Sequence, residues 1–346
     1  MDTRTFAATQ TGRLLERLAS QVDATLRQRS SGDAIHHLRV AVRRFAQAVA
    51  VFKTCFPQKE SRRIRRRLKA ILALAGPVRD CDIALEILGA HKETSLAVEL
   101  RARRQRSGRA LMATLKQWVA RKSAAKWRQA IAAGDVPLPM EEMAQRELRR
   151  RAKPFFRQGS QVAGANAGAG ELHKLRIAAK KLRYTLELFA DLYGPAAEDW
   201  LKRIRGVQSL LGSINDCRAV RSLVASLGGN PKVEATLRRK QRRKTREFQR
   251  LWSEEFAGVG PRQWIHSLRR PPRKPVARHA AAAAVARNAA VAATPPATAA
   301  ARTAVAAASP AAVARHAAVA TTPPATAAAR TAAAATSPAT AASRTA

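Results

Sequence analysis

Apolar residues recur at three- and four-residue spacing from about residue 6 to residue 267, and the alternating runs typical of strands are scarce. In one stretch Ile64, Leu68 and Ile71 share a stripe, and a second stripe of the same helix would carry only cations, namely Arg62, Arg65, Arg66 and Lys69. A helix of this kind buries one face and exposes a cationic ridge on another. The pattern therefore predicts an all-α protein.

Two stretches rich in glycine, proline and small residues interrupt this pattern. Residues 132–139 contain two prolines and a glycine and divide the helical region into halves of similar size, 8–131 and 140–268. Residues 158–170 predict a second loop. We therefore expect one helical domain over residues 8–268, built from two halves.

The composition changes from about residue 269, where alanine, threonine, proline and arginine take over. The segment Thr294–Ala304 recurs as Thr322–Ala332, which gives a repeat of 28 residues. This period is compatible with a solenoid, but each repeat lacks a bulky apolar side chain to bury, which argues against one. Because proline doublets also interrupt an alanine helix, we expect residues 269–346 to form a low-complexity, disordered tail.

A second internal repeat relates the two halves of the helical region. Residues 35–44 and 172–181 both read apolar-His-x-Leu-Arg-apolar-x-x-basic-basic. Further along, residues 76–81 and 212–217 both carry a glycine four positions before an Asp-Cys pair. The histidine and the aspartate are 44 residues apart in the first half and 43 in the second. The repeat predicts an internal duplication with approximate twofold symmetry.

The glycines of the second motif predict helix ends, at Gly76-Pro77 and at Gly212. Asp80 and Asp216 would then lie where the following helices begin. We interpret these carboxylates as N-caps or as partners of nearby arginines. A Mg²⁺ bridge between them and a bound phosphate is the alternative.

The charge of the chain is strongly unbalanced, with 64 Lys and Arg against 24 Asp and Glu and a formal net charge of +40. From Val276 onward there are six arginines and no carboxylates, so the excess belongs mainly to the helical region. Such a surface attracts polyanions such as nucleic acids, anionic lipids or phosphate polymers. The scarcity of carboxylates argues against acid/base catalysis by a carboxylate pair.

Each duplicated segment also lines its cations along one helix face. Like charges at this spacing repel, and a bound polyanion would remove that repulsion. Guanidinium groups suit bidentate phosphate binding. A bound phosphate would favour the protonated form of a histidine, so we expect binding to strengthen in mild acid. A solvated face and structural histidines are the alternatives, but recurrence in both halves favours a binding role. The stripes are His36, Arg39 and Arg43 in the first half and His173, Arg176, Lys180 and Arg183 in the second.

Several other classes of protein are disfavoured by missing patterns. Cys55, Cys81 and Cys217 form no CxxC pair, so neither structural zinc nor a disulfide framework is expected, and a reducing cytoplasm is the default. The first residues lack the pattern of a secretory signal, and no apolar run is long enough to span a membrane. The nucleotide-hydrolysis, hydride-transfer and acyl-transfer motifs are missing, as are HExxH and ExExK. We expect no catalytic residues, metal or cofactor.

The duplicated motifs resemble the CHAD family, the conserved histidine α-helical domain, over about residues 8–268. The resemblance implies two pseudo-symmetric helical bundles around a basic central cavity, binding of inorganic polyphosphate, and localisation to polyphosphate granules. By position it implies a cavity lined by His36, Arg39, Arg43, Arg44, His173, Lys174, Arg176, Lys180, Lys181 and Arg183. A second set of candidates comprises Arg62, Arg65, Arg66, Lys69, Arg79, Lys202 and Arg205.

The sequence thus predicts a non-enzymatic protein that binds inorganic polyphosphate in the cytoplasm. The main alternative is a DNA-associated architectural protein whose basic domain and histone-like tail contact nucleic acid. Only 5% of the residues are aromatic, which gives base stacking little support. A granule-surface protein whose tail contacts another polymer, and an enzyme that cleaves polyphosphate, are further alternatives. The oligomeric state is left open.

Overall fold

The computed structural model describes residues 2–28, 31–89, 94–132, 139–164, 168–257 and 263–264. The secondary structure of these residues is helical and includes no strand, which confirms the predicted all-α fold. The predicted tail, residues 269–346, lies outside the described residues. The α-helices are α1 (Thr3–Arg27), α2 (Gly32–Val51), α3 (Gln58–Leu88), α4 (Ser95–Ala120), α5 (Ser123–Ala132), α6 (Met140–Ala163), α7 (Ala169–Leu188), α8 (Ala190–Tyr193), α9 (Pro195–Ala225) and α10 (Pro231–Trp252).

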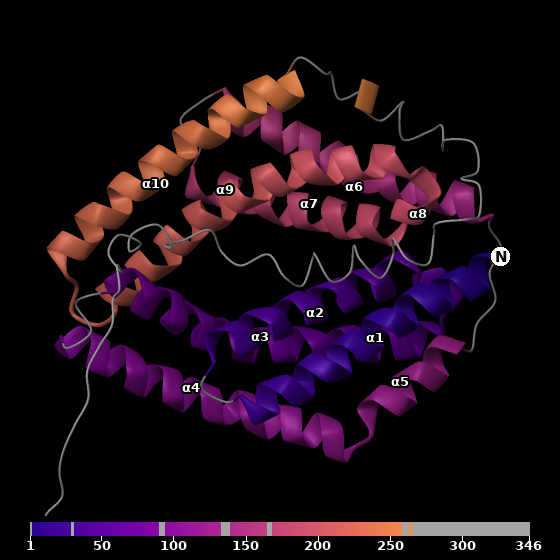
Figure 1. Ribbon diagram of the computed structural model, residues 1–346, viewed down its shortest axis with the longest axis horizontal. Helices are drawn as coiled ribbons and strands as arrows, with labels where there is room; N and C mark the ends of the chain where they lie inside the picture. The colour runs from indigo at the N-terminus through magenta and orange to yellow at the C-terminus, as the bar shows by residue number, and fades with distance from the viewer. Residues whose placement is uncertain are drawn as a thin grey trace, which may run out of the picture. The chain divides into compact units, whose positions relative to one another are not determined.

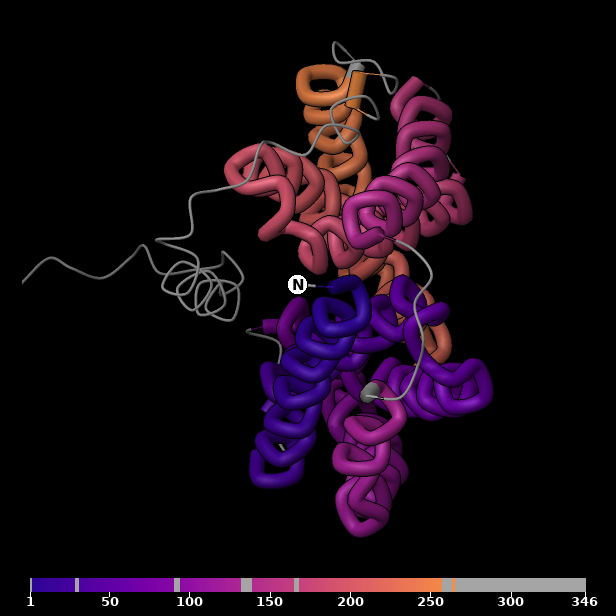
Figure 2. Tube along the Cα trace, turned by 90° about the vertical axis from the view of Figure 1, so that its right-hand side faces the viewer, coloured from indigo at the N-terminus to yellow at the C-terminus, as the bar shows by residue number. Residues whose placement is uncertain are grey.

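The helices form two groups that repeat the same arrangement. Helices α2 and α7 both have 20 residues, and α3 and α9 both have 31. Within the first group α1 packs on α2 and α3 on α4, and within the second α6 packs on α7 and α9 on α10. Figure 1 shows the first group in indigo and purple and the second in magenta to orange, and Figure 2 shows the same two groups from the side.

The two groups meet through two pairs of equivalent helices: α2 contacts α7, and α3 contacts α9. The Gln47 amide donates a hydrogen bond of 2.9 Å to the Thr185 hydroxyl across the first contact. A small apolar cluster from α3, α4, α9 and α10 adds a shared core, in which Cys81 and Cys217 are buried. Both cysteines are free thiols, as is Cys55. The duplicated motifs therefore face one another at the centre of the helical domain.

The expected helix ends at the second motif are wrong. Helix α3 continues through Gly76 and Pro77, and α9 continues through Gly212. A proline inside a helix loses one backbone hydrogen bond. Burial on both sides of the proline offsets this cost, since Ala75 and Val78 are almost completely shielded from solvent.

Residues 158–170 are also more helical than predicted. Helix α6 extends to Ala163 and α7 begins at Ala169, so the connection is only a few residues long. The glycine at position 159 is buried against the Trp252 ring, which shows why a small residue occurs inside this helix. No helix in the part of the chain described here is long and apolar enough to cross a membrane.

Candidate functional site: a cationic cluster between the two halves

The two halves bring their cationic motifs together where α2, α3, α7 and α9 meet. Arg39 lies within electrostatic range of Arg43 on its own helix, of Asp80 and Arg79 on α3, and of Arg176 on α7. Lys180 lies within electrostatic range of Arg39 and Arg43 on α2 and of Arg176 on its own helix, α7. It is also within range of Asp216 on α9. We call this set the central cluster; it comprises His36, Arg39, Arg43, Arg79, Asp80, Arg176, Lys180 and Asp216.

The local sequence explains how these side chains are positioned. On α2 the buried residues Leu38 and Val42 anchor one face in the core, and this turns Arg39 and Arg43 toward the other half. Gly76 of α3 faces Arg39, since a Cβ at this position would lie 3.5 Å from the Arg39 Nη1 atom, an ordinary van der Waals contact. Asp80 lies one helical turn further along α3. The continuous helix thus makes Asp80 a counter-charge for Arg39 instead of an N-cap.

Burial changes the protonation of the basic groups in this cluster. Desolvation, followed by the charges of Arg43 and Arg176, lowers the pKa of Lys180 to about 6. Desolvation and then Arg43 lower the pKa of Arg39 to about 10. Partial burial and then Arg79 lower the pKa of His36 to about 4. At neutral pH the empty cluster therefore holds Lys180 and His36 mainly in their neutral forms.

Several charged nitrogens in the cluster lack a hydrogen-bond acceptor among the described residues. These atoms are Arg39 Nη1, Arg43 Nε and Arg176 Nε, and each is shielded from solvent. Buried polar groups without a partner cost free energy, and charged donors cost most. The cluster therefore has unused capacity for an anionic acceptor.

The carboxylates of the cluster offset only part of its positive charge. Four arginines and Lys180 face two carboxylates, Asp80 and Asp216. Burial raises the pKa of Asp80 even though arginines surround it. The two acids lie close enough to repel one another. They therefore lower the positive charge of the site without neutralising it.

The two motif histidines have different partners. The Nδ1 atom of His173 lies 3.2 Å from the Asn215 Oδ1 atom, a hydrogen-bonded pair between α7 and α9. His36 occupies the equivalent position in the first half, but Arg79 replaces the asparagine there and repels a protonated ring. The duplication is therefore chemically asymmetric at this position.

Two of the expected cavity residues share one carboxylate. Arg44 and Arg183 both pair with Glu187, with N–O distances of 3.1 Å and 3.5 Å. The Arg183 guanidinium also lies 4.9 Å from the centre of the Tyr184 ring. These contacts join α2 to α7 and indicate a structural role beside the central cluster.

The remaining predicted residues are exposed and lie outside the central cluster. The cations of the α3 ridge, Arg62, Arg65, Arg66 and Lys69, face solvent, as predicted from their spacing. On α9, Lys202 and Arg205 are exposed at the positions equivalent to Arg66 and Lys69. On α7, Lys174 and Lys181 are exposed too. Their charge acts on a polyanion at longer range than that of the buried arginines.

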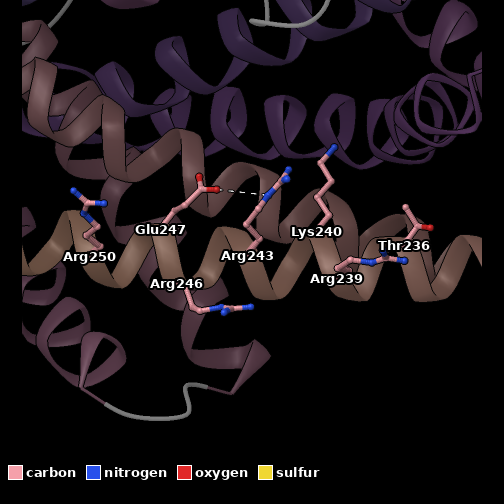
Figure 3. Close-up of a pocket in the computed structure, with 7 residues that line it drawn as sticks. All are labelled: Thr236, Arg239, Lys240, Arg243, Arg246, Glu247 and Arg250. Carbon is pink, nitrogen blue, oxygen red and sulfur yellow. Dashed lines mark ion pairs between the residues drawn. The ribbon is translucent and has the colours of Figure 1, made fainter.

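Helix α10 presents a further cationic stripe (Figure 3). Arg239, Arg243, Arg246 and Arg250 follow one another at four-, three- and four-residue spacing along its solvent face. Glu247 is the carboxylate nearest the middle of this stripe and lies 3.7 Å from Arg243. The stripe adds positive potential at the outer side of the second half.

The sequence singled out Asp80 and Asp216 but did not place them in the middle of a helix, facing the cations. It missed Glu187 altogether, because one acidic residue on a basic helix gives no signal of its partners. Among the residues that the structure describes, no three His, Cys, Asp or Glu side chains gather in an arrangement that could hold a metal ion.

The fold and the site define an internally duplicated helical protein with a cationic centre. The family model of the CHAD domain matches residues 9–225, and the chain belongs to this family. The crystal structure of the CHAD domain from the plant Ricinus communis is similar, with a TM-score of 0.54 and 17% identity over 79% of this chain and 94% of that one. PptA from Streptomyces chartreusis gives a TM-score of 0.54 and 15% identity over 73% of this chain and 100% of that one. No curated protein matches the sequence.

Proposed function

We propose that this protein binds inorganic polyphosphate at the central cluster and catalyses no reaction on it. The observation that carries the proposal is the set of three buried arginine nitrogens without an acceptor, Arg39 Nη1, Arg43 Nε and Arg176 Nε. Family membership supports the same ligand, because the CHAD family is associated with polyphosphate. A linear polymer of phosphates also matches a site that presents equivalent cations from two halves.

Each part of the cluster has a distinct task in this proposal. The arginines donate hydrogen bonds to phosphate oxygens, as the planar guanidinium fork allows. Lys180 takes up a proton when the polyanion enters and then acts as a compact positive charge. Asp80 and Asp216 offset part of the positive charge of Arg39 and Arg176.

The direct test compares two triple variants that remove equal charge. The central variant carries Arg39→Gln, Arg43→Gln and Arg176→Gln, and the control variant changes Arg62, Arg65 and Arg66 of the α3 ridge to Gln. We expect the central variant to lose at least about a hundredfold in affinity for long-chain polyphosphate, since charged hydrogen bonds are lost. The control should lose less than about tenfold, because exposed charges are screened.

Titration calorimetry at physiological salt measures both affinities, and circular dichroism checks that each variant keeps its helices. Equal losses in the two variants would show that only total charge matters and would contradict a specific site. The wild-type titration also tests the non-enzymatic part of the proposal. Release of orthophosphate that stops in Asp80→Asn or Asp216→Asn would establish catalysis instead.

The proposal places the protein on polyphosphate granules in the cytoplasm. A fluorescent fusion of the wild type should collect on granules, and the central variant should not, whereas the control variant should. Binding to DNA is the competing function, through the helical domain or through the residues after Pro275. A chain ending at Pro275 that keeps polyphosphate binding but loses DNA binding would assign DNA to the tail.

A further inference from the structure

A large cleft opens in the first half, next to the central cluster but with a different chemical character. It has a volume of about 1080 Å³ and lies between the start of α2, the second part of α3 and one face of α4. On α4 its wall runs from Arg101 to Lys116, a length of about 22 Å. We call it the first-half cleft.

The duplication provides an internal reference for this cleft. The equivalent place in the second half is lined by the start of α7 and by Ile214, Asn215 and Arg218 of α9, and its volume is only about 10 Å³. Two helical groups with the same arrangement therefore differ in this one space, which is open in the first half and nearly filled in the second. The cleft therefore belongs to the first half alone and does not follow from the helix packing that both halves share.

Particular residues explain why one half is open and the other closed. Arg218 donates a hydrogen bond of 3.2 Å to the Ala169 carbonyl and thereby covers the start of α7. Gln241 of α10 closes the space from the other side and accepts a hydrogen bond from Arg221. In the first half Asp82 stands at the position of Arg218 and pairs with Arg104 of α4.

The lining of the first-half cleft combines three kinds of group. Cationic side chains come from α3 and α4, carboxylates come from α2 and α3, and apolar side chains, here called the floor, come from all three helices. Asp82 is a buried polar residue in the wall of the cleft. Its side chain is only 8% exposed, and its Oδ2 atom has no hydrogen-bond partner among the described residues. The cations are Arg79, Arg101, Arg104, Arg109 and Lys116, the acids are Asp33, Asp82 and Glu86, and the floor includes Ile35, Leu85 and Met112.

Inorganic polyphosphate would use only the cations of this cleft, because it offers no hydrogen-bond donor to the carboxylates and no apolar surface to the floor. A ligand that matches all three kinds of group carries phosphates for the cations, hydrogen-bond donors for the carboxylates and an apolar ring for the floor. The geometry points to a nucleoside phosphate as the occupant of the first-half cleft. This assignment does not depend on polyphosphate binding at the central cluster.

Gly108 lies in the middle of α4 and lines the cleft, and a Cβ there would meet no atom within 4 Å. A larger side chain at this position therefore tests whether the cleft holds a ligand. The Gly108→Phe variant places a ring in the cleft without a clash at its Cβ. Gly12→Phe is the matched control, since a Cβ at Gly12 on α1 also meets nothing within 4 Å. Arg79 is left unchanged because it belongs to the central cluster as well.

Calorimetry would compare ATP with inorganic tripolyphosphate, which has the triphosphate but neither ribose nor base. Both ligands are compared in the central triple variant, which lacks the three arginines of the central cluster. In that background we expect the protein and its Gly12→Phe form to bind ATP more tightly than tripolyphosphate. Gly108→Phe should weaken ATP binding at least about tenfold, because its ring would fill part of the cleft, and should leave tripolyphosphate unchanged. The assignment is overturned if ATP does not bind, if ATP and tripolyphosphate bind equally, or if Gly108→Phe changes neither affinity.

A second variant covers the possibility that Gly108→Phe does not fold. Arg109 and Lys116 are exposed, and the double variant Arg109→Gln, Lys116→Gln should lower ATP affinity while long-chain polyphosphate still binds as in the wild type. Unchanged ATP affinity in this variant would also overturn the assignment. Loss of polyphosphate binding in the central triple variant, with ATP binding retained, would show that the two sites are independent.

Discussion

Lys180 is the residue whose chemistry depends most on the fold. Burial and the neighbouring Arg43 and Arg176 bring its pKa from an ordinary value of 10.5 to about 6. An unfolded chain would hold a proton on this lysine between these two values, while the folded chain would not. Lys180 therefore destabilises the fold as the pH decreases from 10.5 toward 6, and below about 6 no further loss arises from it.

A bound polyanion should restore the proton on Lys180. Because the complex then carries one more proton than the free protein, polyphosphate affinity should rise as the pH falls from about 9 to about 6, by up to about one log unit per pH unit. Calorimetry in buffers of different ionisation enthalpy measures the proton uptake directly. Lys180→Met should abolish the uptake. Uptake of the same size in that variant would assign the proton to another group.

At this scale the sequence predicted the identity of the cations but not their environment. The spacing of Arg39 and Arg43 placed them on one face of a helix, as the structure shows. Whether a basic residue is buried, however, depends on the opposite half of the molecule. For this reason Arg44 and Arg183, which look equivalent to their neighbours in sequence, turn out to be paired with Glu187.

At the scale of helices, the contact between α6 and α10 depends on a glycine. A Cβ at Gly159 would lie 1.8 Å from the Cη2 atom of Trp252. Trp252 also packs among Phe155, Phe156 and Phe256, so its ring has little room to move. The pair fixes how closely these two helices approach.

Gly159→Ala should therefore lower the free energy of unfolding by about 1–3 kcal/mol, through overpacking. Gly12→Ala serves as the reference, because its Cβ meets nothing within 4 Å and alanine favours a helix by about 0.5–1 kcal/mol. Guanidinium denaturation followed by circular dichroism measures both changes. A Gly159→Ala variant as stable as Gly12→Ala would contradict the close packing of α6 against α10.

The helix boundaries show where sequence patterns compete. Gly76-Pro77 predicts a helix end, but the apolar spacing of Ile71, Ala75 and Val78 continues across it. In the structure the apolar pattern decides, because burial on both sides outweighs one lost hydrogen bond. The same burial keeps Asp80 inside the helix and facing Arg39, a placement that the local turn signals could not predict.

At the scale of the whole molecule, duplication made much of the fold predictable. Two copies of one motif in the same order indicated two halves, and α2 and α7 do meet at the centre. The differences between the halves were harder to predict. Asp82 in the first half and Arg218 in the second occupy equivalent positions. Their effect on the size of the cleft depends on contacts with α4, α7 and α10, which the local sequence does not reveal.

We propose that the cluster between the halves recognises polyphosphate and does not merely attract any polyanion. The most direct measurement is a competition at physiological salt, with labelled long-chain polyphosphate on the protein and double-stranded DNA added at equal phosphate concentration. We predict that DNA displaces little polyphosphate from the wild type and from the α3-ridge control. The central variant should lose this preference while keeping its helices. Equal displacement by DNA in all three proteins would contradict the claim and favour diffuse charge attraction.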